Sequence, residues 1–166
     1  MRRKPLRERR MGRTARELRE RVQERLPPGE TLLAFELVVP VAGATGAGGP
    51  SIGGAAGNVV GRIGAVKGSR DSIARSVPRV TKNSRLLVTN QQVALWSPRA
   101  GTQALSHGYG GWTTAWSTPR ATVAHIERRR RLQLLARFRL HFTDGSSAAF
   151  MTPFRASIQR LSDAIG

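Results

Sequence analysis

The stretch Leu132-Gln-Leu-Leu-Ala-Arg-Phe-Arg-Leu-His-Phe142 decides the fold of this chain. Its even-numbered positions are all apolar, and its odd-numbered positions are mostly polar or basic. This period of two predicts a β-strand with one buried face and one wet, basic face. The residues that follow, 143–146, are Thr-Asp-Gly-Ser, and they predict a hairpin turn because glycine adopts the positive φ that such turns need. Residues 147–151 are the predicted return strand.

Further strands are expected on the N-terminal side of this hairpin. Residues 85–96 predict two strands around a turn near Asn90 and Gln91, and residues 30–41 and 121–127 each predict one strand. A short strand is expected at residues 112–117. Its two tryptophans are expected to fill a core, and the alternative is that they stack on bases or lie at a lipid interface. The chain is therefore mainly β.

A helix is expected at each end of this β region. At the C-terminal end, Thr152 is the predicted N-cap and Pro153 the first helical residue. The apolar face of that helix comprises Phe154, Ile158, Leu161 and Ile165, and it is expected to cover the open end of a barrel. Residues 11–26 predict an N-terminal helix that ends at Pro27-Pro28-Gly29. Its narrow apolar stripe comprises Met11, Ala15, Leu18, Val22 and Leu26.

The N-terminal helix has two interpretations. It contacts a partner or a membrane surface, or it packs on its own domain, which is what we expect. Residues 1–10 are expected to be a basic, disordered tail. The start of the chain resembles the basic region of a signal peptide, but the apolar stretch that should follow is missing. We therefore expect the cytoplasm, with peripheral membrane contact as the alternative.

A glycine-rich insert is expected at residues 42–84. Residues 43–49 follow an apolar run and resemble a dinucleotide-binding loop, but Pro50 and the glycines after it impede the helix such a loop needs. No acidic residue stands at the right distance to bind a ribose. Residues 37–61 carry no charge, and glycines recur at every fourth position from Gly49 to Gly61, as in packed membrane helices. A flexible surface insert is the expectation, and a packed glycine-zipper segment in contact with a membrane is the alternative.

The charge of the chain is strongly positive, with 28 Lys plus Arg against 10 Asp plus Glu and a net charge of +18. Such a surface attracts nucleic acid, anionic lipid or an acidic protein. Only three of the basic residues are lysines, and this bias toward arginine, together with abundant Ala and Gly, is also what a GC-rich genome would produce. The charge is therefore either functional or compositional.

Residue types that carry catalysis or bind metals are sparse. The chain has no cysteine, which excludes disulfides and thiol chemistry. His107, His125 and His141 lack the spacing of a metal site, Asp144 belongs to a turn, and Asp163 belongs to a helix. We expect no enzyme activity, no metal and no cofactor.

Basic residues gather around the strand that decides the fold. Four consecutive arginines, Arg128, Arg129, Arg130 and Arg131, lie in an expected turn between strands. Arg137, Arg139 and His141 follow on the outer face of the next strand. Because a guanidinium group donates two hydrogen bonds to phosphate, these residues form one candidate anion-binding patch. The alternative is a solvated face that prevents edge-to-edge pairing of sheets.

The order of these elements resembles the bacterial pleckstrin-homology-like domains. The resemblance is carried by Leu26–Glu30, Leu87–Trp96, Ala121–Ile126 and the stretch from Leu140 to the end, and with their connections these cover residues 26–40 and 85–166. It implies a β-barrel or orthogonal sandwich capped by a C-terminal amphipathic helix, within a domain at residues 27–166. It also implies a binding role without catalytic residues. The glycine-rich insert departs from the family pattern.

Three functions remain open on the sequence alone. The leading hypothesis is an adaptor module whose basic face binds an anionic partner, which is a protein or a lipid headgroup. The second is a nucleic-acid-binding protein that acts through charge with little sequence specificity. The third is a membrane-associated structural component that uses the glycine-rich segment.

Overall fold

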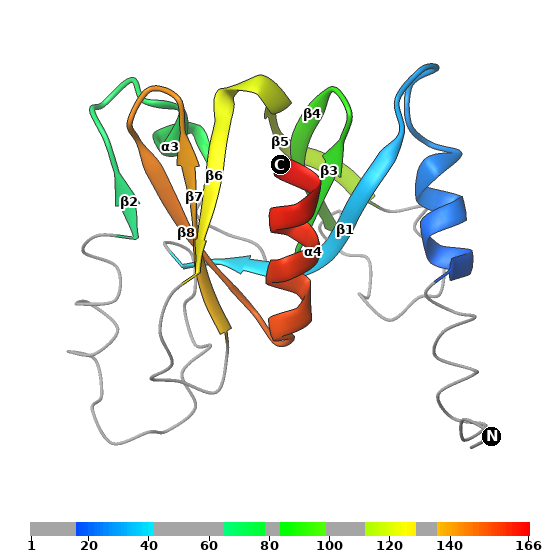
Figure 1. The fold of residues 1–166 in the computed structure, drawn as a ribbon. Helices are drawn as coiled ribbons and strands as arrows, with labels where there is room; N and C mark the ends of the chain where they lie inside the picture. Colours follow the sequence, from blue (N-terminus) through cyan, green and yellow to red (C-terminus); the bar gives the residue numbers. More distant parts are fainter. Residues whose placement is uncertain (1–15, 42–64, 79–83, 99–111, 129–135) are drawn as a thin grey trace.

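A computed structural model describes residues 16–41, 65–78, 84–98, 112–128 and 136–166 (Figure 1). It contains an N-terminal helix at residues 16–23 and the short helices α3 (Ile73–Ser76) and η3 (Arg120–Thr122, a 3-10 helix), and α4 (Arg155–Ile165) ends the chain. The strands are β1 (Leu32–Pro40), β2 (Val66–Lys67), β3 (Ser84–Thr89), β4 (Gln92–Pro98), β5 (Trp112–Pro119), β6 (Val123–Arg128), β7 (Ala136–Phe142) and β8 (Ser147–Thr152). The prediction of a mainly β protein with helices at both ends is confirmed.

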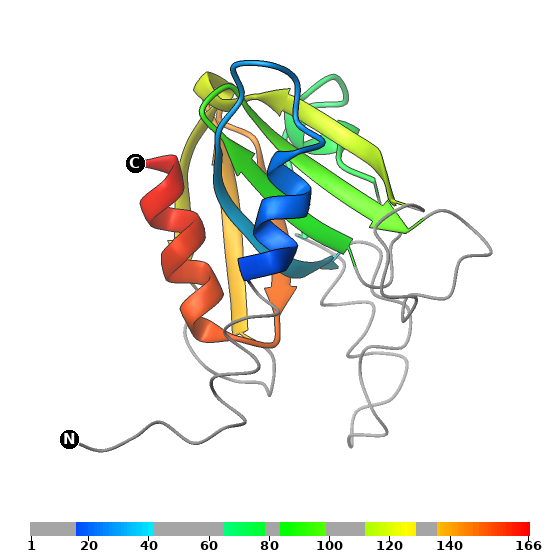
Figure 2. The same ribbon diagram turned by 90° about the vertical axis from the view of Figure 1, so that its right-hand side faces the viewer.

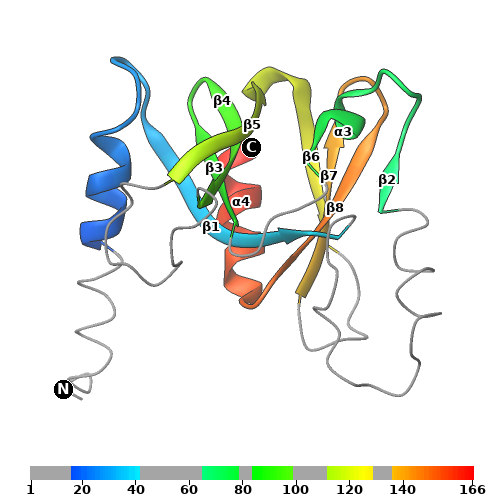
Figure 3. The same ribbon diagram turned by 180° about the vertical axis from the view of Figure 1, so that it is seen from behind.

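The strands form an antiparallel sheet in the order β5-β4-β3-β1-β8-β7-β6, and β2 pairs with β8. Strand β1 belongs to two halves of this sheet, because residues 32–38 pair with β3 whereas Val39 and Pro40 pair with β8 (Figures 1 and 3). We call β1, β3, β4 and β5 the first half, and β8, β7, β6 and β2 the second half. Strands β5 and β6 stand at the two ends of the order and do not pair in the part of the chain that the structure describes, so a closed barrel is not formed there.

The main core lies between the two halves and is covered by α4. Phe138 of β7 and Phe150 of β8 stack with ring centroids 5.5 Å apart, and both are fully buried. Ile158 and Leu161 of α4 belong to the same cluster, as does Trp116 of β5. Helix α4 was expected to cover the open end of a barrel; it covers the core, but the described strands do not close into a barrel. The expectation that Trp116 fills a core is confirmed.

The N-terminal helix lies on the outer face of the first half. Figure 1 shows β1 passing between this helix and α4, and Figure 2 shows the same arrangement from the side. Val22 is fully buried and forms a second, smaller cluster with Phe35, Leu87, Ala94 and Trp96, against which Leu18 and Leu26 pack. Within the described residues this helix packs on its own domain, as expected. Residues 11–15 of the predicted helix lie outside them.

The start of α4 differs from the prediction. Thr152 is still the last residue of β8, where it pairs with Ala136, so the chain is extended at that point. The N-cap of α4 is Phe154, and no side chain caps the helix. Phe154 is 61% exposed, so its place on the buried face of the helix was also predicted wrongly.

Part of the predicted glycine-rich insert packs on the second half of the sheet. Ala65, Ala74 and Val77 are buried. The β7–β8 turn anchors α3, because Asp144 Oδ2 accepts a hydrogen bond from Ile73 N at 2.8 Å and Ser146 Oγ accepts one from Ala74 N at 3.1 Å. Residues 42–64 and 79–83 lie outside the described residues. The dinucleotide-loop and glycine-zipper interpretations concern the first of these segments.

Candidate anion-binding site

Strand β7 presents opposite chemistry on its two faces. Phe138, Leu140 and Phe142 point into the main core and are at most 2% exposed. Because successive side chains of a strand alternate, Arg137, Arg139 and His141 occupy the outer face. The predicted buried face is confirmed.

Arg139 contradicts the expectation that the outer face of β7 is fully exposed to solvent. It is only 4% exposed, and its Nη1 donates a hydrogen bond to Ser147 Oγ of β8 at 2.9 Å. This side of the sheet is partly covered, because Met151 and Ala149 of β8, which pair with Arg137 and Arg139, pack with Val41 and Ala65. The Arg139 guanidinium is consequently held in one place by its surroundings.

His141 belongs to a cluster that the sequence did not indicate. Its imidazole stacks on that of His125, its partner across the β6–β7 pair, with centroids 4.4 Å apart and an interplanar angle of 8°. His141 Nε2 also lies 2.9 Å from Glu127 Oε2. Only the register of β6 against β7 brings these residues together, and a single sequence does not reveal register.

Arg128 lies on a different face from the three basic residues of β7. Its neighbour Glu127 contacts His141 on the outer face, so Arg128 points to the other side of β6. There its Nη2 donates to Gln159 Oε1 of α4 at 2.8 Å. The structure therefore brings together Arg137, Arg139 and His141 but separates Arg128 from them. Arg129, Arg130 and Arg131 lie outside the described residues.

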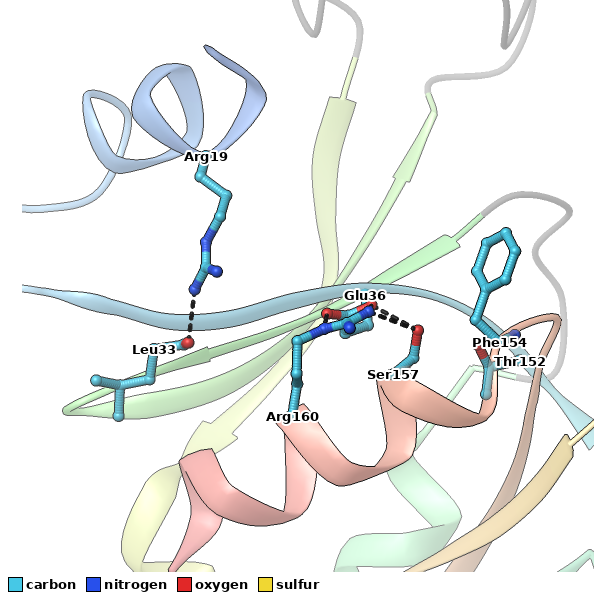
Figure 4. Close-up of polar contacts among 7 residues, drawn as sticks. All are labelled: Arg19, Leu33, Glu36, Thr152, Phe154, Ser157 and Arg160. Carbon is cyan, nitrogen blue, oxygen red and sulfur yellow. Dashed lines mark hydrogen bonds and ion pairs between the residues drawn. The ribbon is translucent and has the colours of Figure 1, made fainter. Parts of the chain in front are cut away.

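A second polar cluster joins α4 to β1 (Figure 4). The carboxylate of Glu36 is bonded to Arg160 and accepts a hydrogen bond from Ser157 Oγ at 2.6 Å. Burial alone would raise the pKa of Glu36, but the hydrogen bonds from Arg160 and Ser157 and the positive charge of Arg160 outweigh it and lower that pKa. This cluster pairs its own charges and serves to attach the helix.

Asp144 stays a turn residue, as predicted. Hydrogen bonds, chiefly from Ser146 and then from the backbone of Ile73, lower the pKa of its carboxyl group. Within the residues described, no three His, Cys, Asp or Glu side chains are placed to hold a metal ion. Among these same residues, no helix has the length and apolar character that crossing a membrane requires.

Comparison of the chain with protein-family models, with curated proteins and with solved structures finds no match.

Proposed function

We propose that this protein is a non-catalytic binding module with a pleckstrin-homology-like arrangement, and that it engages an anionic partner through the outer face of β7. The proposed arrangement is supported by the strand order, in which β1 is shared between two antiparallel halves, and by the helix that follows the last strand. The covering of the main core by Ile158 and Leu161 of that helix supports it as well.

One observation carries the proposed binding role: three successive outward positions of β7 are basic. They are Arg137, Arg139 and His141, and the outward positions of β8 beside them, Ser147, Ala149 and Met151, bear no charge. Glu127 is the one acidic residue among their paired neighbours on β6 and β8. A strand face of this kind carries a net positive charge at neutral pH.

The guanidinium groups on this face suit the binding of oxyanions. Arg139 is held by burial and by Ser147, so it contributes its positive charge to this face from a fixed position. Arg137 is only half-buried, so part of its side chain is accessible from outside. A carboxylate or a phosphate oxygen accepts hydrogen bonds from an accessible guanidinium group. An acidic protein and a lipid headgroup share this chemistry, and both are partners of the proposed kind.

The test removes two positive charges from this face and two from elsewhere. Arg137→Gln/Arg139→Gln is compared with Arg16→Gln/Arg75→Gln, whose arginines are exposed and lie in the N-terminal helix and in α3. Binding to anionic vesicles and to polyglutamate is measured across a salt titration, and thermal melting checks that each variant is folded.

The proposal predicts that the β7 double variant loses about tenfold or more in affinity for at least one probe, and that the control loses about twofold or less. Equal losses in the two variants would mean that the net charge of +18 acts without a site. Binding that follows total phosphate, with duplex DNA as an effective competitor, would favour nucleic-acid binding instead.

A further inference from the structure

Phe154 is the most exposed large apolar side chain in the part of the chain that the structure describes. It is 61% exposed. The other exposed large apolar side chain among the described residues, Leu33, is 37% exposed. Phe154 stands at the junction of β8 and α4, two residues after the buried Thr152. An exposed aromatic ring at this junction contributes little to the core.

The local backbone gives no reason for phenylalanine at this position. Phe154 is the N-cap of α4, and no side chain makes a capping hydrogen bond there. Ser, Thr, Asp and Asn are the residues that stabilise an N-cap, because their oxygen atoms accept bonds from the first backbone N–H groups. Neither burial nor capping therefore accounts for the ring.

Positive charge lies next to this ring. Arg155 follows Phe154 and is exposed, and the first turn of α4 has no acidic residue. Gln159 lies one turn after Arg155 on the same side of the helix, and it accepts a hydrogen bond from Arg128 at 2.8 Å. This bond joins Arg128, at the end of β6, to the second turn of α4. The nearest acid along the helix is Asp163, to which Gln159 Nε2 donates at 2.7 Å.

From this arrangement we infer that the start of α4 docks on an anionic lipid surface, where Phe154 enters the bilayer interface and Arg128 and Arg155 bind headgroup phosphates. The inference rests on the proposed function, because both require an anionic partner. It adds a second surface, on the opposite side of β6 from the outer face of β7, and it names the partner.

A membrane explains these features better than an acidic peptide does. An apolar side chain in a peptide-binding site normally lines a recess, where the partner covers it on several sides. Phe154 instead lies on an exposed turn, and an aromatic ring on such a turn enters the headgroup region without a complementary pocket. Arginines that flank such a ring are attracted to the negative surface potential of anionic lipids.

The experiment is co-sedimentation of the full chain with vesicles of phosphatidylcholine, alone or mixed with phosphatidylglycerol. Phe154→Ser is compared with Phe154→Leu, which keeps an apolar side chain, and Arg128→Gln/Arg155→Gln with the control Arg16→Gln/Arg75→Gln. Phe154 is exposed, so each of its variants is expected to fold, and thermal melting verifies this. Binding to soluble polyglutamate is measured in parallel.

We expect wild type to bind the mixed vesicles and not the neutral ones. Phe154→Ser should lower the affinity for mixed vesicles roughly tenfold, and Phe154→Leu by about threefold or less. Neither change should alter binding to polyglutamate. The double arginine variant should weaken vesicle binding more than its control does.

Three results would overturn the inference: wild type that does not bind the mixed vesicles, Phe154→Ser that binds them like wild type, or equal losses for vesicles and polyglutamate. The last would assign the start of α4 to an acidic protein. None of these results decides the proposed function, which fails only if Arg137→Gln/Arg139→Gln matches its own control with both probes.

Discussion

The two long helices are attached to β1 in different ways. The helix at residues 16–23 lies on the outer face of the first half, where it buries one residue fully, Val22, over a small cluster of its own. Helix α4 lies on the inner side and contributes Ile158 and Leu161 to the main core. The polar contacts differ as well: Gln23 and Arg19 form hydrogen bonds with backbone atoms around β1, whereas Arg160 and Ser157 bond the carboxylate of Glu36. Helix α4 is thus part of the fold, and the N-terminal helix is an addition to it.

The largest effect is expected for Leu161→Ala. Leu161 is fully buried in the main core, so the substitution removes buried methyl groups and leaves a cavity. A loss of about 2–5 kcal/mol in the free energy of unfolding follows, measured by urea denaturation. The exposed Arg155→Ala in the same helix should change it by less than about 0.5 kcal/mol. Similar small values for the two variants would show that α4 does not belong to the core.

A smaller loss is expected for Val22→Ala. The side chain is fully buried but smaller than leucine, and its cluster includes Trp96. We predict a loss of about 1–2 kcal/mol, together with a change in tryptophan fluorescence as the helix loosens over Trp96. Arg16→Ala, on the exposed side of the helix, is the control. If Val22→Ala costs as much as Leu161→Ala, the distinction between the two helices is lost.

The attachment of α4 through Glu36 predicts a dependence of stability on pH. The pKa of Glu36 in the folded protein lies below its ordinary value of 4.5. A lowered pKa means that the ionised form stabilises the fold above about pH 4.5, and that this stability is lost as the pH falls through the folded pKa. Glu36→Gln should cost on the order of 1–2 kcal/mol at pH 7 and progressively less below pH 4.5.

Denaturation curves for wild type and Glu36→Gln at a series of pH values test this. An equal cost at pH 7 and pH 3 would contradict the role of the Glu36 charge. Arg160→Gln should show the same loss of pH dependence, because it removes the partner of the carboxylate.

The smallest effect has the opposite sign. Phe154→Ser provides α4 with a capping oxygen that it lacks, and we predict a gain of about 0.5–1 kcal/mol in thermal or urea denaturation. Arg16→Ser, at an exposed position within the N-terminal helix, is the control and should bring no gain. If Phe154→Ser destabilises the protein, the phenylalanine ring has a structural role.

The parts of the fold that follow from local patterns could be predicted from the sequence. The period of two in residues 136–142, the turn at Asp144-Gly145 and the hairpin around Asn90 and Gln91 all appear in the structure. The N-cap of α4 could not be predicted, because pairing of Thr152 with Ala136 extends β8 and overrides the capping preference of threonine.

The candidate site was predicted in part. The alternation of apolar and polar residues along β7 placed Arg137, Arg139 and His141 on one face of the strand. It gave no information about which residues of other strands pack against that face. The bond of Arg139 to Ser147 and the packing of Val41 and Ala65 beside Met151 depend on tertiary contacts, and the stack of His125 on His141 depends on register. Arg128 was grouped with the β7 residues because it is near them in sequence, whereas its bond to Gln159 places it beside α4.

The most direct test of the proposed binding face is an NMR titration that observes the arginine Nε–H groups. The Nε atoms of Arg137 and Arg139 are buried, which slows their exchange with water and makes these signals observable. Titration with tripolyphosphate at low salt should shift the signals of Arg137 and Arg139 more than those of the exposed arginines of the N-terminal helix and α3. Shifts of similar size at all arginines, or none at Arg137 and Arg139, would contradict the claim that the outer face of β7 binds anions.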